Sequence, residues 1–121
     1  MYQVIYQYQE NIEIALSDQV SKDEFLQVLH QLESLIVTYN KINVLLDTSD
    51  LANLDFDIMK DEMSFFKNKE NYLARIAVVT EKASETIILN IFDKLTNTDI
   101  RTYTPGDYDE AVKWIFPPKL P

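Results

Sequence analysis

The sequence contains no cysteine and only one glycine, Gly106. The lack of cysteine excludes a disulfide framework, a thiolate metal site and a cysteine nucleophile. A single glycine cannot build a phosphate-binding loop, a dinucleotide-binding fingerprint or a nucleophile elbow, since each of these motifs needs more than one. A chain without cysteine also fits the reducing cytoplasm, which is the location that we expect.

Positive charge is scarce as well. The 121 residues include 20 acidic and 11 basic side chains, which gives a formal net charge of −9. Nucleic acids and anionic lipid surfaces are bound through lysine and arginine, so the charge balance argues against both as partners. The N-terminal residues lack a basic leader, and no run approaches the ~18 apolar residues of a membrane span. We expect neither a signal peptide nor a transmembrane segment.

Histidine occurs once, at His30. A serine nucleophile needs a base, usually histidine, within hydrogen-bond reach, and His30 falls off the apolar stripe of its predicted helix. Carboxylates are numerous, but their spacing singles out no pair of the kind that glycosidases use. We therefore predict that the protein is not an enzyme, and that it holds no cofactor and no catalytic metal ion.

The sequence does contain enough apolar residues for one core. Hydrophobic residues make up 46% of the chain and aromatic residues 12%. A chain of this length buries roughly two thirds of its unfolded surface when it folds. No linker, repeat or low-complexity segment divides the chain, so we predict a single domain over residues 1–121.

Five segments have strand patterns. Alternation of apolar residues predicts strands over 2–8 and 12–16, joined by a hairpin turn at residues 9–11. Nearly continuous apolar runs predict buried strands at 42–46, ending at Asp47, and at 75–79, ending at Thr80. A weaker strand is expected at 100–103.

Four segments have helical spacing. A capping box of Ser21 and Glu24 opens the first helix, and Asn40 ends it. The second follows a polar loop over 48–53, the third starts near Ser84, and the fourth follows a second capping box over 107–110. The expected inward positions are Phe25, Val28, Leu29, Leu32, Leu35, Ile36 and Tyr39 in the first helix, and Phe56, Met59, Met63 and Phe66 in the second. In the third they are Ile87, Ile88, Ile91, Phe92 and Leu95, and in the fourth Ala111, Val112, Trp114 and Ile115.

Strands that alternate with helices imply parallel strands joined by crossovers, which are right-handed in nearly all known cases. If each crossover steps to the adjacent strand, the sheet grows in one direction and the helices share a face. The predicted fold class is therefore α/β. We expect a mainly parallel five-stranded sheet built as a βα superhelix, with an antiparallel N-terminal edge strand and four helices mostly on one face.

Several segments together resemble one bacterial family. Residues 41–47 are similar to its lysine-isoleucine, leucine-leucine-aspartate strand, and Asp50-Leu51 stands where it has an aspartate-aromatic pair. Residues 75–79 match its most recognisable strand, and residues 110–115 match its glutamate-alanine and tryptophan-leucine ending. In this order, from Asn11 to Phe116, the segments resemble the SpoIIAA-like family, which is related to STAS and CRAL-TRIO domains.

The resemblance implies a STAS-like superhelix and two kinds of function. STAS relatives are protein-interaction or nucleotide-sensing modules, some switched by serine phosphorylation, and CRAL-TRIO relatives hold lipids. The phosphorylated serines of STAS domains lie at the start of the helix after the aspartate-ended strand. Phe56 and Asp57 stand there in this chain and Ser49 is in another register, so the usual switch is not expected.

Polar residues follow the carboxyl ends of the predicted parallel strands, where open α/β sheets bind ligands. With Asp55, the nearby Asp47 and Asp50 could bind magnesium through oxygen atoms. Asp47 and Thr80 also match two positions of a phospho-receiver domain. The chain lacks two other receiver features, the second acidic residue after the first strand and the lysine before a proline after the last strand. A phospho-regulated or magnesium-dependent switch or enzyme centred on Asp47 is therefore the alternative hypothesis.

The apolar stripe of the second predicted helix supports the leading hypothesis. Its methionines suit a loosely specified ligand, although such stripes usually pack as ordinary core. We predict a non-catalytic binding or regulatory module for a protein partner or an apolar small molecule, lipids included. The candidate binding residues are Asp47, Ser49, Asp50, Phe56, Met59, Met63, Phe66 and Thr80. A homodimer through the tyrosine-rich edge of the first strand is a further hypothesis.

Overall fold

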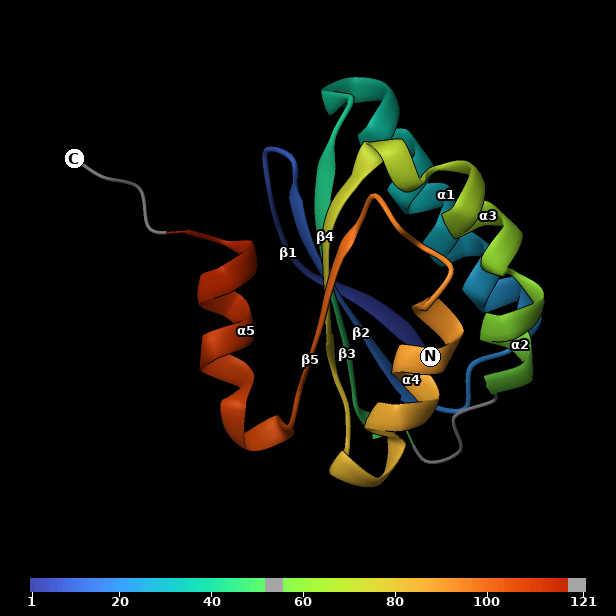
Figure 1. Cartoon of the computed structure of the whole chain (residues 1–121), viewed down its shortest axis with the longest axis vertical. Coiled ribbons are helices and arrows are strands. Elements are labelled where there is room, and N and C mark those ends of the chain that lie inside the picture. Colours follow the sequence, from blue (N-terminus) through green and yellow to red (C-terminus); the bar gives the residue numbers. More distant parts are fainter. Residues whose placement is uncertain (52–55, 118–121) are drawn as a thin grey trace.

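A mixed five-stranded sheet, with helices on both faces, forms the centre of the protein (Figure 1). The computed structural model describes residues 1–51 and 56–117. The strands are β1 (Tyr2–Tyr8), β2 (Asn11–Asp18), β3 (Ile42–Leu51), β4 (Leu73–Val79) and β5 (Asp99–Tyr103). The helices are α1 (Lys22–Tyr39), α2 (Phe56–Asp61), α3 (Met63–Asn68), α4 (Glu85–Phe92) and α5 (Tyr108–Ile115). No helix in the described ranges is long and apolar enough to cross a membrane.

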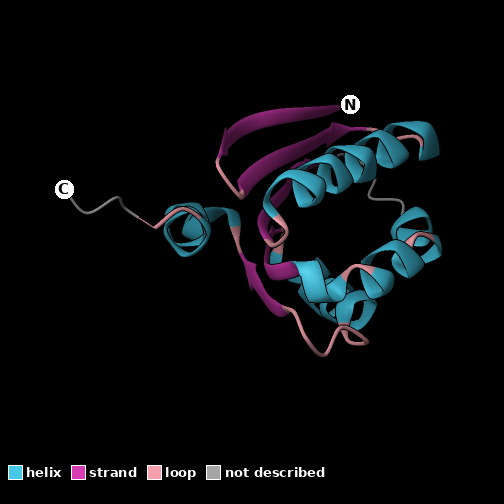
Figure 2. Ribbon diagram, turned by 90° about the horizontal axis from the view of Figure 1, so that it is seen from above, coloured by secondary structure: helices cyan, strands magenta, loops and turns pink. Residues whose placement is uncertain are grey.

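The strands lie side by side in the order of the sequence, β1-β2-β3-β4-β5. β1 pairs with β2 in antiparallel orientation, and all later neighbours are parallel. Each crossover moves one strand in the same direction, and right-handed crossovers then place their helices on one face. Figure 2 shows α1 to α4 on that face and α5 alone on the other. The predicted superhelix, with its antiparallel N-terminal edge strand, is confirmed.

Side chains of β3 and β4 are buried alternately on the two faces of the sheet. Val44, Leu46 and Ile76 face the larger core, which α1 to α4 cover. Leu45 and Ala77 face a smaller core, which Ala111 and other residues of α5 complete. Burial on both faces explains why these strands read as continuous apolar runs.

The predicted capping box of α1 is present. The Glu24 backbone N–H donates to Ser21 Oγ at 3.1 Å, and the Ser21 N–H donates to Glu24 Oε1 at 3.4 Å. The helix ends at Asn40, which has a positive φ of 72° and donates its N–H to the carbonyl of Ile36. Tyr39, predicted to face inward, is 42% exposed because it lies in this final turn.

The second predicted capping box does not form. Residues 105–107 make a short 3-10 turn, so Asp107 lacks the extended backbone of an N-cap and makes no side-chain capping bond. Its carboxylate instead accepts a hydrogen bond from Thr104 Oγ1 at 3.3 Å.

Two predicted boundaries are wrong. β3 continues to Leu51 where a polar loop was expected from Thr48, because the strand keeps pairing with Ser17 and Asp18 of β2. Thr48 is buried there, and its hydroxyl donates to the carbonyl of Val79 at 2.8 Å. The second predicted helix is broken at Glu62 into α2 and α3, so the described chain has five α-helices instead of four.

The double-sided burial of the central strands gives a stability prediction. Ile76 is fully buried in the larger core, and Ile76→Ala should lower the free energy of unfolding by about 2–5 kcal/mol through lost burial and an internal cavity. Val37→Ala is the matched control, because Val37 is 82% exposed on α1. Equilibrium urea unfolding measures both changes. Equal, small losses in the two variants would contradict the packing described.

The homodimer hypothesis concerns pairing through the outer edge of β1. The strand has no charged residue, and Val4, Ile5 and Tyr6 are 38%, 46% and 53% exposed. Uncharged edges invite pairing, whereas a lysine on an edge blocks it. We expect concentration-dependent dimerisation in sedimentation velocity that Ile5→Lys abolishes and Val37→Lys leaves intact. A wild-type monomer at every concentration would rule out the dimer.

Candidate functional site

Of the polar residues predicted to follow the parallel strands, Asp47, Ser49 and Asp50 lie within β3, and Thr80 directly follows β4. Asp47 is half-buried, and its Oδ1 accepts hydrogen bonds from the backbone N–H and the hydroxyl of Ser49, at 3.0 and 2.5 Å. Asp50 is exposed. Thr80 is buried, and its backbone N–H donates to the carbonyl of Tyr103 at 2.9 Å.

The carboxylates of the hypothetical magnesium site are only partly described. Asp55 and the side chain of Phe56 lie outside the described residues. Within residues 1–51 and 56–117, no three histidine, aspartate or glutamate side chains gather closely enough to hold a metal ion. The hydrogen bonds of Asp47 are to Ser49 in the same strand, β3.

The predicted methionine-phenylalanine stripe divides between core and surface. Met59 and Phe66 are 2% and 1% exposed and belong to the larger core. The ring of Phe66 makes edge-to-face contacts with Phe65 and Phe92, at centroid distances of 5.5 and 5.3 Å. Met63 is half-buried and lines a surface groove. Of the stripe residues whose side chains are described, Met63 alone lines this groove.

This groove lies between α2, α3 and α4 and has a volume of about 440 Å³. Met63, Ile87 and Ile91 provide its apolar lining, and Asp57, Lys60, Asn90 and Lys94 provide its polar lining. The helical spacing predicts that Ile87 faces inward, but its side chain is 42% exposed. The reason is that α4 has five apolar residues in eight, and only Ile88 and Phe92 fit beneath it as buried residues.

A second polar cluster lies on the opposite face of the sheet, under α5. Glu13 is only 4% exposed, and its Oε2 accepts a hydrogen bond from the Tyr108 hydroxyl at 2.5 Å. Burial raises the pKa of Glu13, the Tyr108 hydrogen bond lowers it, and the charge of Asp47 raises it further. Burial and the bond to Glu13 likewise raise the pKa of Tyr108 above its ordinary value.

The amino-acid sequence does not reveal this cluster of Glu13 and Tyr108. The alternation of Ile12 and Ile14 places Glu13 on the other face, which a strand near the edge of a sheet normally exposes to solvent. The face is covered because α5, 95 residues later in the chain, packs against it. No local pattern reveals that contact.

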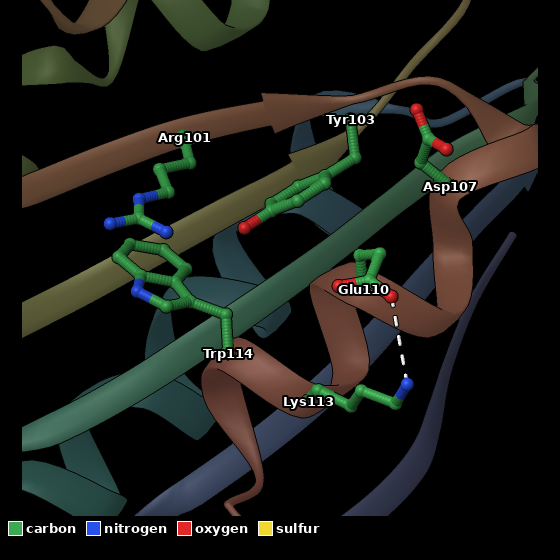
Figure 3. A pocket seen from close by; sticks show the side chains of 6 residues that line it. All are labelled: Arg101, Tyr103, Asp107, Glu110, Lys113 and Trp114. Atoms are coloured by element: carbon green, nitrogen blue, oxygen red, sulfur yellow. Dashed lines mark ion pairs between the residues drawn. The ribbon is translucent and has the colours of Figure 1, made fainter.

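A third feature is an open groove between β5 and α5, of about 550 Å³ (Figure 3). The guanidinium of Arg101 lies over the indole ring of Trp114, 4.4 Å from its centroid, and that of Arg75 lies 5.2 Å from the same point. Glu110 and Lys113 form an ion pair at 3.5 Å on α5. The remaining lining residues are Tyr103 and Asp107.

The buried carboxyl group of Glu13 gives a pH prediction. Because its pKa is higher in the folded than in the unfolded chain, where it is near 4.5, protonation of this group favours folding. Its contribution is complete below the unfolded pKa and is lost as the pH rises through the folded pKa. Glu13→Gln keeps an acceptor for Tyr108 without ionising, so we expect it to remove this loss.

The measurement is the urea unfolding midpoint as a function of pH, from a lower pH beneath the unfolded-state pKa to an upper pH well above it. For each protein, the midpoint at the upper pH is compared with the midpoint of the same protein at the lower pH. The ratio of upper to lower midpoint should be larger for Glu13→Gln than for the wild type. Glu33→Gln, at an exposed position of α1, is the matched control. A profile for Glu13→Gln that coincides with the wild type would show that Glu13 is not buried as described.

Comparison with known proteins identifies the family. The SpoIIAA-like family model matches residues 11–116. A crystal structure of an uncharacterised DUF3478 family protein with a SpoIIAA-like fold, from Shewanella loihica PV-4, is similar with a TM-score of 0.70 and 15% identity, over 94% of this chain and 93% of that chain. Comparison with curated proteins gives no match. The structural likeness shows the fold, and the family model covers most of the sequence, so this chain belongs to the SpoIIAA-like family.

Proposed function

We propose that the protein is a non-catalytic binding module, and that its ligand is a small molecule with an apolar chain and an acidic group. The proposed site is the groove between α2, α3 and α4. The observation that carries the proposal is that Ile87, an apolar residue, is 42% exposed and lines this groove together with Met63 and Ile91. An apolar ligand that covers these side chains removes their surface from water.

The charges of the groove favour an acidic group on the ligand. Lys60 and Lys94 both line it, against one carboxylate, Asp57, in a chain whose net charge is −9. Burial of an alkyl chain contributes about 0.8 kcal/mol for each methylene group. An exposed ion pair contributes only about 0–1 kcal/mol. The apolar contact therefore determines most of the affinity, and the lysines orient the ligand.

We also propose that this module is cytoplasmic, since a chain without cysteine fits the reducing cytoplasm. A protein partner that inserts an apolar side chain next to an acidic one would meet the same groove chemistry.

The test uses two residues of the same short helix. Ile87 and Leu89 are exposed to similar extents, 42% and 45%, but only Ile87 lines the groove. Dodecanoate is titrated against protein loaded with the fluorescent probe anilinonaphthalene sulfonate. We expect Ile87→Glu to weaken dodecanoate binding about tenfold or more, because it places a carboxylate in the apolar wall. Leu89→Glu should bind as the wild type does.

Dodecanol tests the role of the lysines. It should bind up to about fivefold more weakly than dodecanoate, as expected for one exposed charge pair, and Lys94→Gln should reduce the difference. Ile87→Glu and Leu89→Glu should both keep the wild-type free energy of unfolding within about 0.5 kcal/mol. Equal binding by Ile87→Glu and Leu89→Glu would place the ligand elsewhere, and no displacement by either compound would favour a protein partner.

A further inference from the structure

We propose that Arg101 and Trp114, with Arg75 beside them, bind the oxyanion group of a small molecule, a carboxylate or a phosphate, at one end of the groove between β5 and α5. This site is on the face of the sheet opposite the proposed apolar groove, so the two proposals are independent.

The position of the arginines is the first argument. The sequence has two arginines and one tryptophan, and the fold brings all three together. Arg75 lies on β4 and Arg101 on the adjacent β5, where it pairs with Ala77. Trp114 comes from α5, and both guanidinium groups lie within 5.2 Å of its ring centroid. Two like charges against one ring repel each other, and a bound anion relieves that repulsion.

The difference in side-chain hydrogen bonding between the two arginines is the second argument. Arg75 donates from one terminal nitrogen to the carbonyl of Trp114 at 2.9 Å, which fixes the position of both residues. Arg101 is exposed, and its contact with the Trp114 ring is the one side-chain interaction that it makes with the described part of the chain. A guanidinium has five N–H donors in a planar fork that matches two oxygens of a carboxylate or phosphate. Stacking on Trp114 restricts the orientation of the Arg101 guanidinium and so reduces the entropy lost when the anion binds.

The acidic residues nearby are the third argument. Asp99 stands opposite Arg75 in the strand register, but within the described ranges the two form no ion pair. At the other end of the groove, Glu110 pairs with Lys113, and Asp107 accepts a hydrogen bond from Thr104. The acidic end of the groove thus has partners within the protein, whereas Arg101 lines the groove over the Trp114 ring, apart from Asp107 and Glu110 (Figure 3).

The aromatic lining indicates what else the ligand can carry. Tyr103 is half-buried in the same groove, and its ring lies beside the Arg101–Trp114 stack in Figure 3. A ring attached to the oxyanion can pack against Tyr103. Phenyl phosphate and benzoate are therefore the probes, and benzyl alcohol is the uncharged control.

Trp114 is the single tryptophan, so its indole N–H resonance in nitrogen-labelled protein reports on this site alone. We expect phenyl phosphate or benzoate to shift that resonance in a saturable way, and benzyl alcohol to leave it nearly unchanged. The probe with the higher affinity identifies the oxyanion as phosphate or carboxylate. A benzyl alcohol response equal to that of benzoate would overturn the proposal.

Two variants with the same change in net charge decide the role of Arg101. Arg101→Gln should weaken binding about tenfold or more, as expected when a charge-assisted bidentate contact is lost. Lys113→Gln removes a positive charge from the same groove and should change binding less than about twofold, since an exposed charge alone contributes little. Arg101→Lys, which keeps the charge but not the fork, should lie between them.

Equal effects of Arg101→Gln and Lys113→Gln would reduce the result to general electrostatic attraction and overturn the site. Unchanged binding in Arg101→Gln would do the same. Arg101 is exposed, so Arg101→Gln should unfold at nearly the same urea concentration as the wild type. Ile87→Glu should leave the phenyl phosphate response unchanged, which separates this proposal from the apolar site.

Discussion

The structure depends on burying the aliphatic side chains of β3 and β4 on both faces of the sheet. Leu46 and Ile76 need the cover of α1 to α4, and Leu45 and Ala77 need α5. The first requirement is met by the crossovers themselves, since right-handed connections that step in one direction place their helices together. The cover of Leu45 and Ala77 requires a helix that does not connect two strands of the sheet. α5 meets it because it follows the last strand and is free to take the opposite face (Figure 1).

The late return of α5 creates the polar chemistry of that face. A single eight-residue helix covers only part of a five-stranded sheet. Apolar side chains from the two central strands fill the area beneath it, whereas the flanking strands contribute Glu13 on one side and Arg101 on the other. Glu13 is buried and needs the Tyr108 hydroxyl as a donor. Arg101 remains at the surface, stacked on Trp114. Both contacts therefore follow from the limited width of the same helix.

The sequence predicts most of the fold because the fold is local in origin. Strand periodicity, the Ser21 capping box and the order of elements each depend on neighbouring residues, and sequential strand order follows from short right-handed crossovers. The errors arise where contacts between distant segments decide. β3, for example, extends past Asp47 because β2 still offers partners. Glu13 and Tyr108 cannot be paired from sequence, since no local signal connects residues so far apart.

The candidate sites were harder to predict than the core for a related reason. Apolar spacing on a helix tells which residues are able to face inward, but it does not tell how many of them the core accepts. Met59 and Met63 have the same spacing signal, yet one is core and the other lines a groove. On α4, the run Ile87-Ile88-Leu89 covers more than one face, so some of these side chains had to remain at the surface. An excess of apolar residues over the capacity of the core is thus a sequence feature that can point to a binding surface, once the architecture sets that capacity.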